Sequence, residues 1–220
     1  MNSKLALISA VASASIGMAY GASNIVVDNF NTPAFSITSA GTDLGDTVPS
    51  GTDTSLTGTV LRDVALTSIG GSGSFSANND AGYVEWSNGP LRSSNLTISY
   101  TFPSQNITGS AFSFLIVGSD PIAASTQVTI TTTAGTLTSP VTAVPTTVGL
   151  FNILLNTFSG PGNLNFATGI QFSFITASPG ADRAIDAFGI DLPQVPEAST
   201  YAAVGFMSIA AFGAYRRVRK

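Results

Sequence analysis

The strongest constraint on the fold is an alternation of apolar and polar residues with a period of two. In the segment NLTISYTF, at 95–102, one face carries Leu96, Ile98, Tyr100 and Phe102. The pattern recurs in SAFSFLIV at 110–117 and in IQFSFI at 170–175. Successive side chains of a β-strand point to opposite faces, so each segment predicts a strand with one buried face. The body of the chain shows no convincing helical period.

Turn signals such as GGSG, NGP and SGPG separate further strand candidates, at 25–30, 59–69, 83–86, 128–132 and 151–155. Two sheets built from such strands must bury their apolar faces against each other. We therefore expect an all-β fold: an antiparallel β-sandwich, jelly-roll-like, at 23–194. There is no fixed repeat period, which argues against a solenoid. The Thr-, Gly- and Asp-rich segment at 40–58 is expected to be a long loop, with Asp43, Asp46 and Asp53 solvated.

The chain has no cysteine and no histidine. This excludes thiol nucleophiles, imidazole bases, zinc sites of the Cys/His kind and disulfides. Between residues 22 and 194, three arginines (Arg62, Arg92 and Arg183) stand against eleven acidic residues, a net charge of −8. An acidic body with isolated arginines does not follow a phosphate backbone, so we exclude nucleic acid as a partner.

The N-terminus has the order of a secretory signal peptide. Lys4 precedes an apolar run at 5–18, and Ala19-Tyr20-Gly21 places small residues where a signal peptidase cleaves. We predict a signal helix at 1–22 that is removed by signal peptidase.

The C-terminus combines an uncharged apolar segment with a basic end. Residues 199–215 would reach about 25 Å as a helix, near the lower limit for spanning a bilayer core. The basic end consists of Arg216, Arg217, Arg219 and Lys220. Because basic clusters stay in the cytoplasm, we predict a single transmembrane helix with the body outside the inner membrane.

The segment before this helix carries the residues Val195, Pro196, Glu197, Ala198, Ser199 and Thr200. Together with the helix and the basic end, it resembles the PEP-CTERM sorting signal of Gram-negative exported proteins, here at 195–220. The resemblance implies processing near Pro196-Glu197 by exosortase, an integral-membrane cysteine protease or transpeptidase. It also implies a location in the cell envelope or outside the cell. The family usually has a second proline where this chain has Ala198.

Four short segments of the body resemble galactose-binding-like jelly rolls and carbohydrate-binding modules. They are VVDNF at 26–30, LRDVAL at 61–66, GYVEW at 82–86 and DRAIDAFGI at 182–190. Those folds often hold a structural calcium near the paired first and last strands, and Asp28 and Asp186 match these positions. Two interpretations stay open: a calcium site, or an Asx turn at Asp28 and a strand-end cap at Asp186.

Tyr83 and Trp86 are the candidates for a sugar-stacking platform. Alternation groups Trp86 with Val84 and so favours the core for Trp86, which leaves Tyr83 as the surface aromatic. The body carboxylates on predicted strands are Asp63, Glu85 and Asp186, and nothing in their spacing favours a glycosidase pair over surface charge.

The sequence thus predicts a non-enzymatic, exosortase-processed envelope or extracellular-matrix protein with a structural or adhesive body. The alternative is a carbohydrate-binding module-like protein that binds extracellular polysaccharide. A glycoside hydrolase is the third interpretation.

Overall fold

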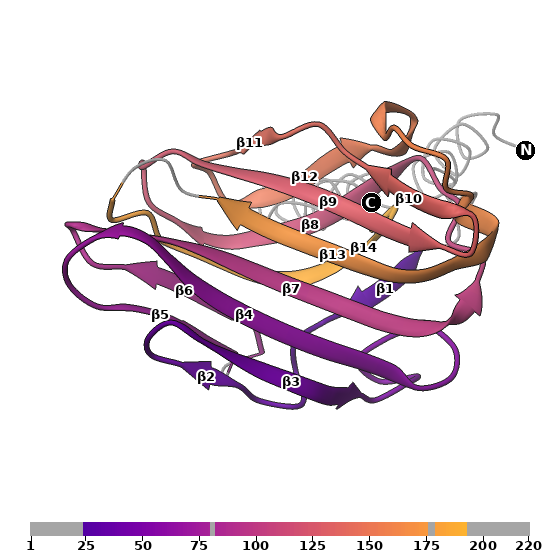
Figure 1. The fold of residues 1–220 in the computed structure, drawn as a ribbon, viewed down its shortest axis with the longest axis horizontal. Helices are drawn as coiled ribbons and strands as arrows, with labels where there is room; N and C mark the ends of the chain where they lie inside the picture. Colours follow the sequence, from indigo (N-terminus) through magenta and orange to yellow (C-terminus); the bar gives the residue numbers. More distant parts are fainter. Residues whose placement is uncertain (1–23, 80–81, 176–178, 193–220) are drawn as a thin grey trace, which may run out of the picture.

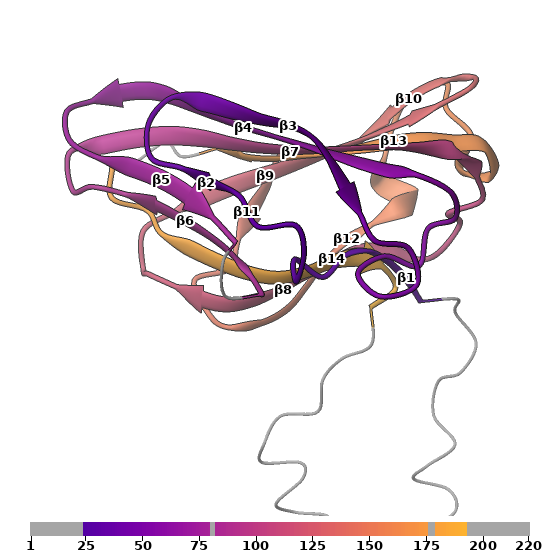
Figure 2. The ribbon, with the colours of Figure 1, turned by 90° about the horizontal axis from the view of Figure 1, so that it is seen from below.

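Two antiparallel sheets stack face to face to form the body, as the views in Figures 1 and 2 show. The computed structural model describes residues 24–79, 82–175 and 179–192. The predicted all-β sandwich is confirmed, since regular helix in these ranges is limited to the short 3-10 turns η1 (Leu155–Thr157) and η2 (Leu164–Phe166). None of the described helices is long and apolar enough to span a membrane. The predicted helices at 1–22 and 199–215 lie outside the described residues.

The first sheet, sheet A, has seven strands. Its spatial order is β12 (Gly149–Leu154), β8 (Ala111–Ser119), β14 (Arg183–Ile190), β6 (Val84–Asn88), β5 (Phe75–Asn78) and β2 (Ser36–Ile37), with β1 (Ile25–Asp28) also paired to β14.

The second sheet, sheet B, also has seven strands. Its spatial order is β10 (Gly135–Thr138), β9 (Ala124–Thr132), β13 (Ala167–Ile175), β7 (Arg92–Gln105), β4 (Val60–Gly71) and β3 (Gly41–Val48), with β11 (Thr142–Val144) also paired to β9. The strands β10, β11 and β12 lie along one side of the sandwich in Figure 1, and β2 and β3 lie along the other.

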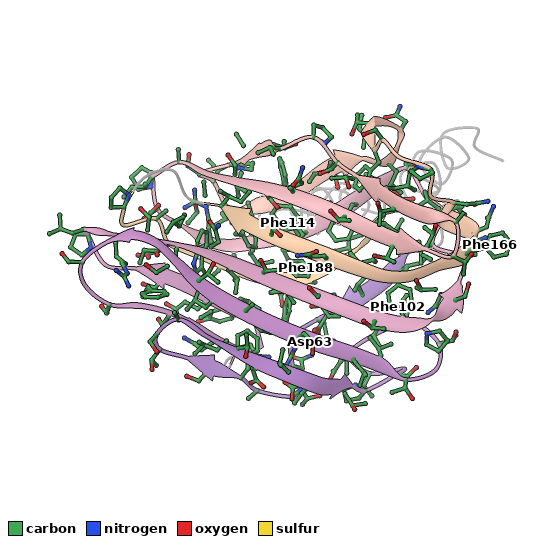
Figure 3. The ribbon with its side chains drawn as sticks, in the orientation of Figure 1. Asp63, Phe102, Phe114, Phe166 and Phe188 are labelled. Carbon is green, nitrogen blue, oxygen red and sulfur yellow. The ribbon has the colours of Figure 1, made fainter. Side chains whose placement is uncertain are left out.

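The core is a layer of aromatic rings between the sheets, where the alternating segments meet. Phe172 of β13 lies 4.3 Å from Phe188, 5.1 Å from Phe114 and 5.8 Å from Phe112 between ring centroids. These three partners belong to sheet A, so Phe172 of sheet B joins strands β8 and β14. Figure 3 labels two of the partners, Phe114 and Phe188. The predicted inward faces of β7, β8 and β13 are buried, as alternation requires.

The expected loop at 40–58 is wrong for its first half, because Gly41–Val48 forms strand β3 at the edge of sheet B. This edge strand buries only Val48, so hydrophobic alternation does not reveal it. Gly45 has φ +79° at a register shift between Asp43 and Asp46, and its N–H donates to the Asp63 carboxylate at 2.7 Å. Polar, glycine-rich composition here marks a bulged edge strand.

The first and last strands of the described body lie side by side. Strand β1 pairs with β14 so that Ile25 lies opposite Ile190. The predicted signal peptide and the predicted sorting signal therefore join the body at neighbouring points.

We predict that Phe172→Ala lowers the free energy of unfolding by about 3–5 kcal/mol, because it leaves a cavity between the sheets. The matched control is Phe166→Ala, since Phe166 is 52% exposed. That change should cost less than about 0.5 kcal/mol. Urea denaturation followed by circular dichroism measures both, and equal losses would contradict this description of the core.

Candidate functional site

A hollow lies on the outer face of sheet A, across β8, β14 and β6. The register places Ala184 of β14 between Gly118 of β8 and Glu85 of β6. The hollow has a volume of about 560 Å³. Its lining comprises Asn31, Gly82, Tyr83, Glu85, Val117, Gly118, Ala184 and Asp186.

Small residues form the floor of the hollow. A Cβ atom at Gly118 would lie 3.1 Å from the Cβ of Ala184, a contact tighter than usual, so a larger side chain there would have to displace its neighbour. At the rim, Gly82 has φ +79°, a conformation that favours glycine, and a Cβ there would lie 3.0 Å from Asn31 Oδ1. The depression therefore follows from residues without bulk, placed side by side on paired strands.

The walls of the hollow carry one aromatic ring and polar groups. Tyr83 is half-buried, Glu85 is exposed and Asp186 is half-buried. Burial raises the pKa of the Asp186 carboxyl above its usual value. No arginine or lysine is among the lining residues that the structure describes. The arrangement offers a stacking surface together with hydrogen-bond acceptors.

Of the two predicted stacking aromatics, the structure leaves only Tyr83 at the surface. Trp86 is fully buried, stacks on Phe174 at 5.5 Å and donates its indole N–H to Ser94 Oγ at 2.9 Å. Trp86 therefore belongs to the core and cannot contact a sugar in this structure, as the alternation of 83–86 indicated.

The three carboxylates considered for hydrolysis do not gather at one place. Glu85 and Asp186 share the hollow on sheet A. Asp63 lies on β4 of sheet B, where its carboxylate accepts from the Gly45 N–H (Figure 3). At most two of the three can act on one ligand.

Asp28, the other candidate calcium ligand, is buried inside the sandwich. Its Oδ2 accepts from Arg62 Nη1 at 3.0 Å and from the Tyr100 hydroxyl at 3.0 Å, and its Oδ1 accepts from the Phe30 N–H at 2.7 Å. The Phe30 contact is the predicted Asx turn. Asp186, in contrast, lines the outer hollow. Nowhere in the described ranges do three or more acidic side chains gather around a possible metal position. Calcium at this pair stays a prediction.

The partner of Asp28 is a fully buried arginine. Arg62 also donates through Nη2 to Asp46 Oδ2 at 3.3 Å and to the carbonyl of Pro33, and it lies over the Phe35 ring at 5.1 Å. Burial lowers the pKa of Arg62, but Asp28, Tyr100 and Asp46 together outweigh burial, so the pKa is raised. For Asp28, burial raises the pKa of the carboxyl, and the positive charge of Arg62 opposes that shift.

The expected solvation of the acidic residues at 40–58 is wrong for two of them. Asp46 pairs with Arg62, and Asp53 is 5% exposed and accepts from the Thr32 hydroxyl.

A second buried arginine, Arg183, donates to Asp120 Oδ1 at 2.9 Å and to the Ile122 carbonyl at 2.6 Å.

Sequence reasoning missed both buried arginines, although alternation carried the signal. Arg62 lies two residues after Val60 and two before Val64, on the predicted inward face of its strand. Arg183 lies two residues before the buried Ile185, on the same inward face of its strand. An arginine at such a position needs a carboxylate partner, because an unpaired buried charge is too costly.

The candidate sorting residues at 195–200 and the basic residues at 216–220 lie outside the described residues. The structure therefore leaves both assignments as predictions.

Comparisons with known proteins give matches among solved structures. The sequence matches no family model and no curated protein. The chain is similar to the family 11 carbohydrate-binding module of the cellulosomal cellulase Lic26A-Cel5E of Clostridium thermocellum, with a TM-score of 0.39 and 11% identity over 76% of this chain and 94% of that one.

Two further structures of this kind match. The family 11 module from Clostridium thermocellum in complex with a β-1,3-1,4-mixed-linked tetrasaccharide gives a TM-score of 0.39, with 12% identity over 76% of this chain and 95% of that one. The solution structure of CtCBM11 gives 0.42, with 14% identity over 78% and 96%. Carbohydrate-binding modules are thus among the structures that resemble this chain, and the low TM-scores carry no ligand over to it.

We predict that Arg62→Met lowers the free energy of unfolding by about 3–5 kcal/mol at neutral pH, because it leaves Asp28 buried without its counter-charge. Because Arg62 lowers the pKa of Asp28, its removal raises that pKa further, and protonation then favours the folded state more in the variant than in the wild type. The loss should therefore shrink as the pH falls. Urea denaturation at several pH values measures both effects.

The matched variant is Asp28→Asn with Arg62→Met, which removes both charges and should restore much of the stability. Arg92→Met, which removes a half-buried arginine, should cost less. A double variant no more stable than Arg62→Met would contradict the ion-pair interpretation.

Proposed function

We propose that this protein is a non-catalytic, carbohydrate-binding β-sandwich that is exported and retained in the cell envelope or extracellular matrix. One observation carries the proposal: Tyr83, Glu85, Asp186 and Asn31 surround a hollow on the outer face of sheet A. Its ligand is a neutral polysaccharide of that matrix.

The chemistry of these residues suits a sugar ring. The apolar face of a pyranose packs on the flat ring of a tyrosine, and ring hydroxyls donate to carboxylates and exchange hydrogen bonds with an amide. A shallow site with one aromatic and a few convergent polar groups fixes orientation without enclosing the ligand. An open surface of this kind accepts the interior of a long chain as well as its end.

The charge of the hollow selects among polysaccharides. Glu85 and Asp186 contribute negative charge, and the lining described has no basic side chain to balance them. Like charges in contact disfavour binding, so polysaccharides rich in uronate or sulfate are poor ligands. Neutral glycans and glycans with amino sugars remain as candidate ligands.

The proposed location rests on the two chain ends. The signal peptide at 1–22 and the PEP-CTERM-like segment at 195–220 together give an exported body held first at the inner membrane and then processed by exosortase. Because β1 and β14 are paired, both segments leave the body at neighbouring points. The hollow lies on the outer face of sheet A and faces away from the buried core.

We predict that Tyr83→Ala lowers affinity for a neutral polysaccharide by about tenfold or more, because it removes the stacking surface. Tyr83→Phe should keep most of the affinity. The matched control is Phe166→Ala, which removes an exposed aromatic that does not line the hollow. Isothermal titration against neutral glucans, galactomannans and alginate measures the affinities. Equal affinity of Tyr83→Ala and the wild type, preference for alginate, or release of reducing sugar would each overturn the proposal.

We predict that Glu197→Ala blocks C-terminal processing when the protein is expressed with exosortase, because it removes the one charge of the motif. The variant should keep residues 199–220 and stay in the inner-membrane fraction. Mass spectrometry of the mature protein detects the difference, with Glu85→Ala as a control that is processed normally. Retention of the C-terminal segment in mature wild-type protein would contradict exosortase processing.

A further inference from the structure

The edges of the two sheets are protected against pairing with other chains at nearly every described edge strand. Strand β2 has two residues, and β3 carries Asp43, Asp46 and the bulge at Gly45. Strand β11 has three residues and lies between Pro140 and Pro145. Short strands, charges, bulges and prolines are the usual devices that prevent edge pairing.

Two other exposed sides are covered by the chain itself. Thr138 of β10 and Ser159 exchange backbone hydrogen bonds, both at 2.9 Å. On the free side of β1, the Ser55 N–H donates to the Val26 carbonyl at 2.9 Å, and the Val26 N–H donates to Ser55 Oγ at 2.8 Å.

Strand β12 lacks these protections except at its last residue. It runs for six residues, GLFNIL, in unbroken register with β8, and it contains no charge and no proline. In the part of the chain that the structure describes, β12 pairs with β8 alone, and the Thr157 hydroxyl covers only the carbonyl of its last residue, Leu154. Leu154 is 53% exposed, and Val148, just before the strand, is 66% exposed.

The charge pattern identifies the partner that fits this edge. Residues 121–181 contain no Asp, Glu, Arg or Lys, so β9 to β13 are all uncharged. A twofold contact brings the two copies of the same edge together, so charges of one sign on that edge would lie close to each other and oppose the contact. A different protein partner would instead be recognised through complementary charge, which this edge lacks. The body carries a net charge of −8, so a second copy is repelled least where the chain is uncharged, and β12 lies in that uncharged part.

We propose that β12 pairs antiparallel with β12 of a second copy of this chain, which joins the two A sheets into one continuous sheet. The contact is isologous, because the same strand is used on both sides. It supplies main-chain partners to the free edge and covers Leu154 and Val148. The inference does not depend on glycan binding.

Single-cysteine cross-linking of the full-length protein tests this pairing, because the chain has no cysteine of its own. Asn152→Cys puts one thiol on the exposed side of β12, and Thr47→Cys puts one on the exposed side of β3 as a matched control. A short bis-maleimide bridges directly opposed and diagonal positions across antiparallel strands. Without added polysaccharide, we expect Asn152→Cys to shift from monomer to a product of twice the mass, and Thr47→Cys to stay monomeric.

A charged substitution at the edge provides a second test of the pairing. Leu154→Lys in the Asn152→Cys chain should abolish the cross-linked dimer, whereas Thr47→Lys in the same chain should leave it unchanged, and circular dichroism verifies that each variant is folded. The proposal is overturned if Asn152→Cys stays monomeric, if it links mainly to another protein, if Thr47→Cys dimerises equally, or if folded Leu154→Lys still dimerises.

Discussion

The structure depends on the burial of two apolar sheet faces against each other, because the chain has no disulfide to hold them. Phe172 packs on rings from β8 and β14 across the interface, and the other alternating strands continue this layer. The ion pair of Asp28 and Arg62 crosses the same interface and fixes strand β1 against sheet B. The hydroxyl of Tyr100 completes the pair, so the buried charges are compensated as burial requires.

Much of this fold was predictable from the period of two. The inward faces of β7, β8 and β13 follow directly from it, and so does the division of Trp86 and Tyr83 between core and surface. Strand β3 was not predictable, because it buries only Val48 and so shows no apolar alternation. The burial of Arg62 was readable from its position between Val60 and Val64, but its pairing with Asp28, distant in sequence, needed the three-dimensional structure. Likewise, sequence spacing could not show that Glu85 and Asp186 share a hollow while Asp63 lies on the other sheet.

The proposed glycan surface and the proposed pairing edge use different parts of sheet A. The hollow lies over β6, β8 and β14, and β12 is the next strand beyond β8. An antiparallel pair has its twofold axis perpendicular to the sheet, so pairing through β12 would put two hollows on the same face of one continuous sheet. Two sites on one face bind a polymer with greater avidity than either alone. Such a dimer would suit a protein that holds polysaccharide in a matrix.

Hydrogen–deuterium exchange of the full-length protein, with and without a neutral polysaccharide fragment, shows whether the hollow on sheet A binds glycan. We expect slower exchange on binding in residues 82–88 and in the neighbouring parts of β8 and β14, with sheet B unchanged. Slower exchange confined to β4, β7 and β13, or no change for any neutral glycan at saturating concentration, would contradict it.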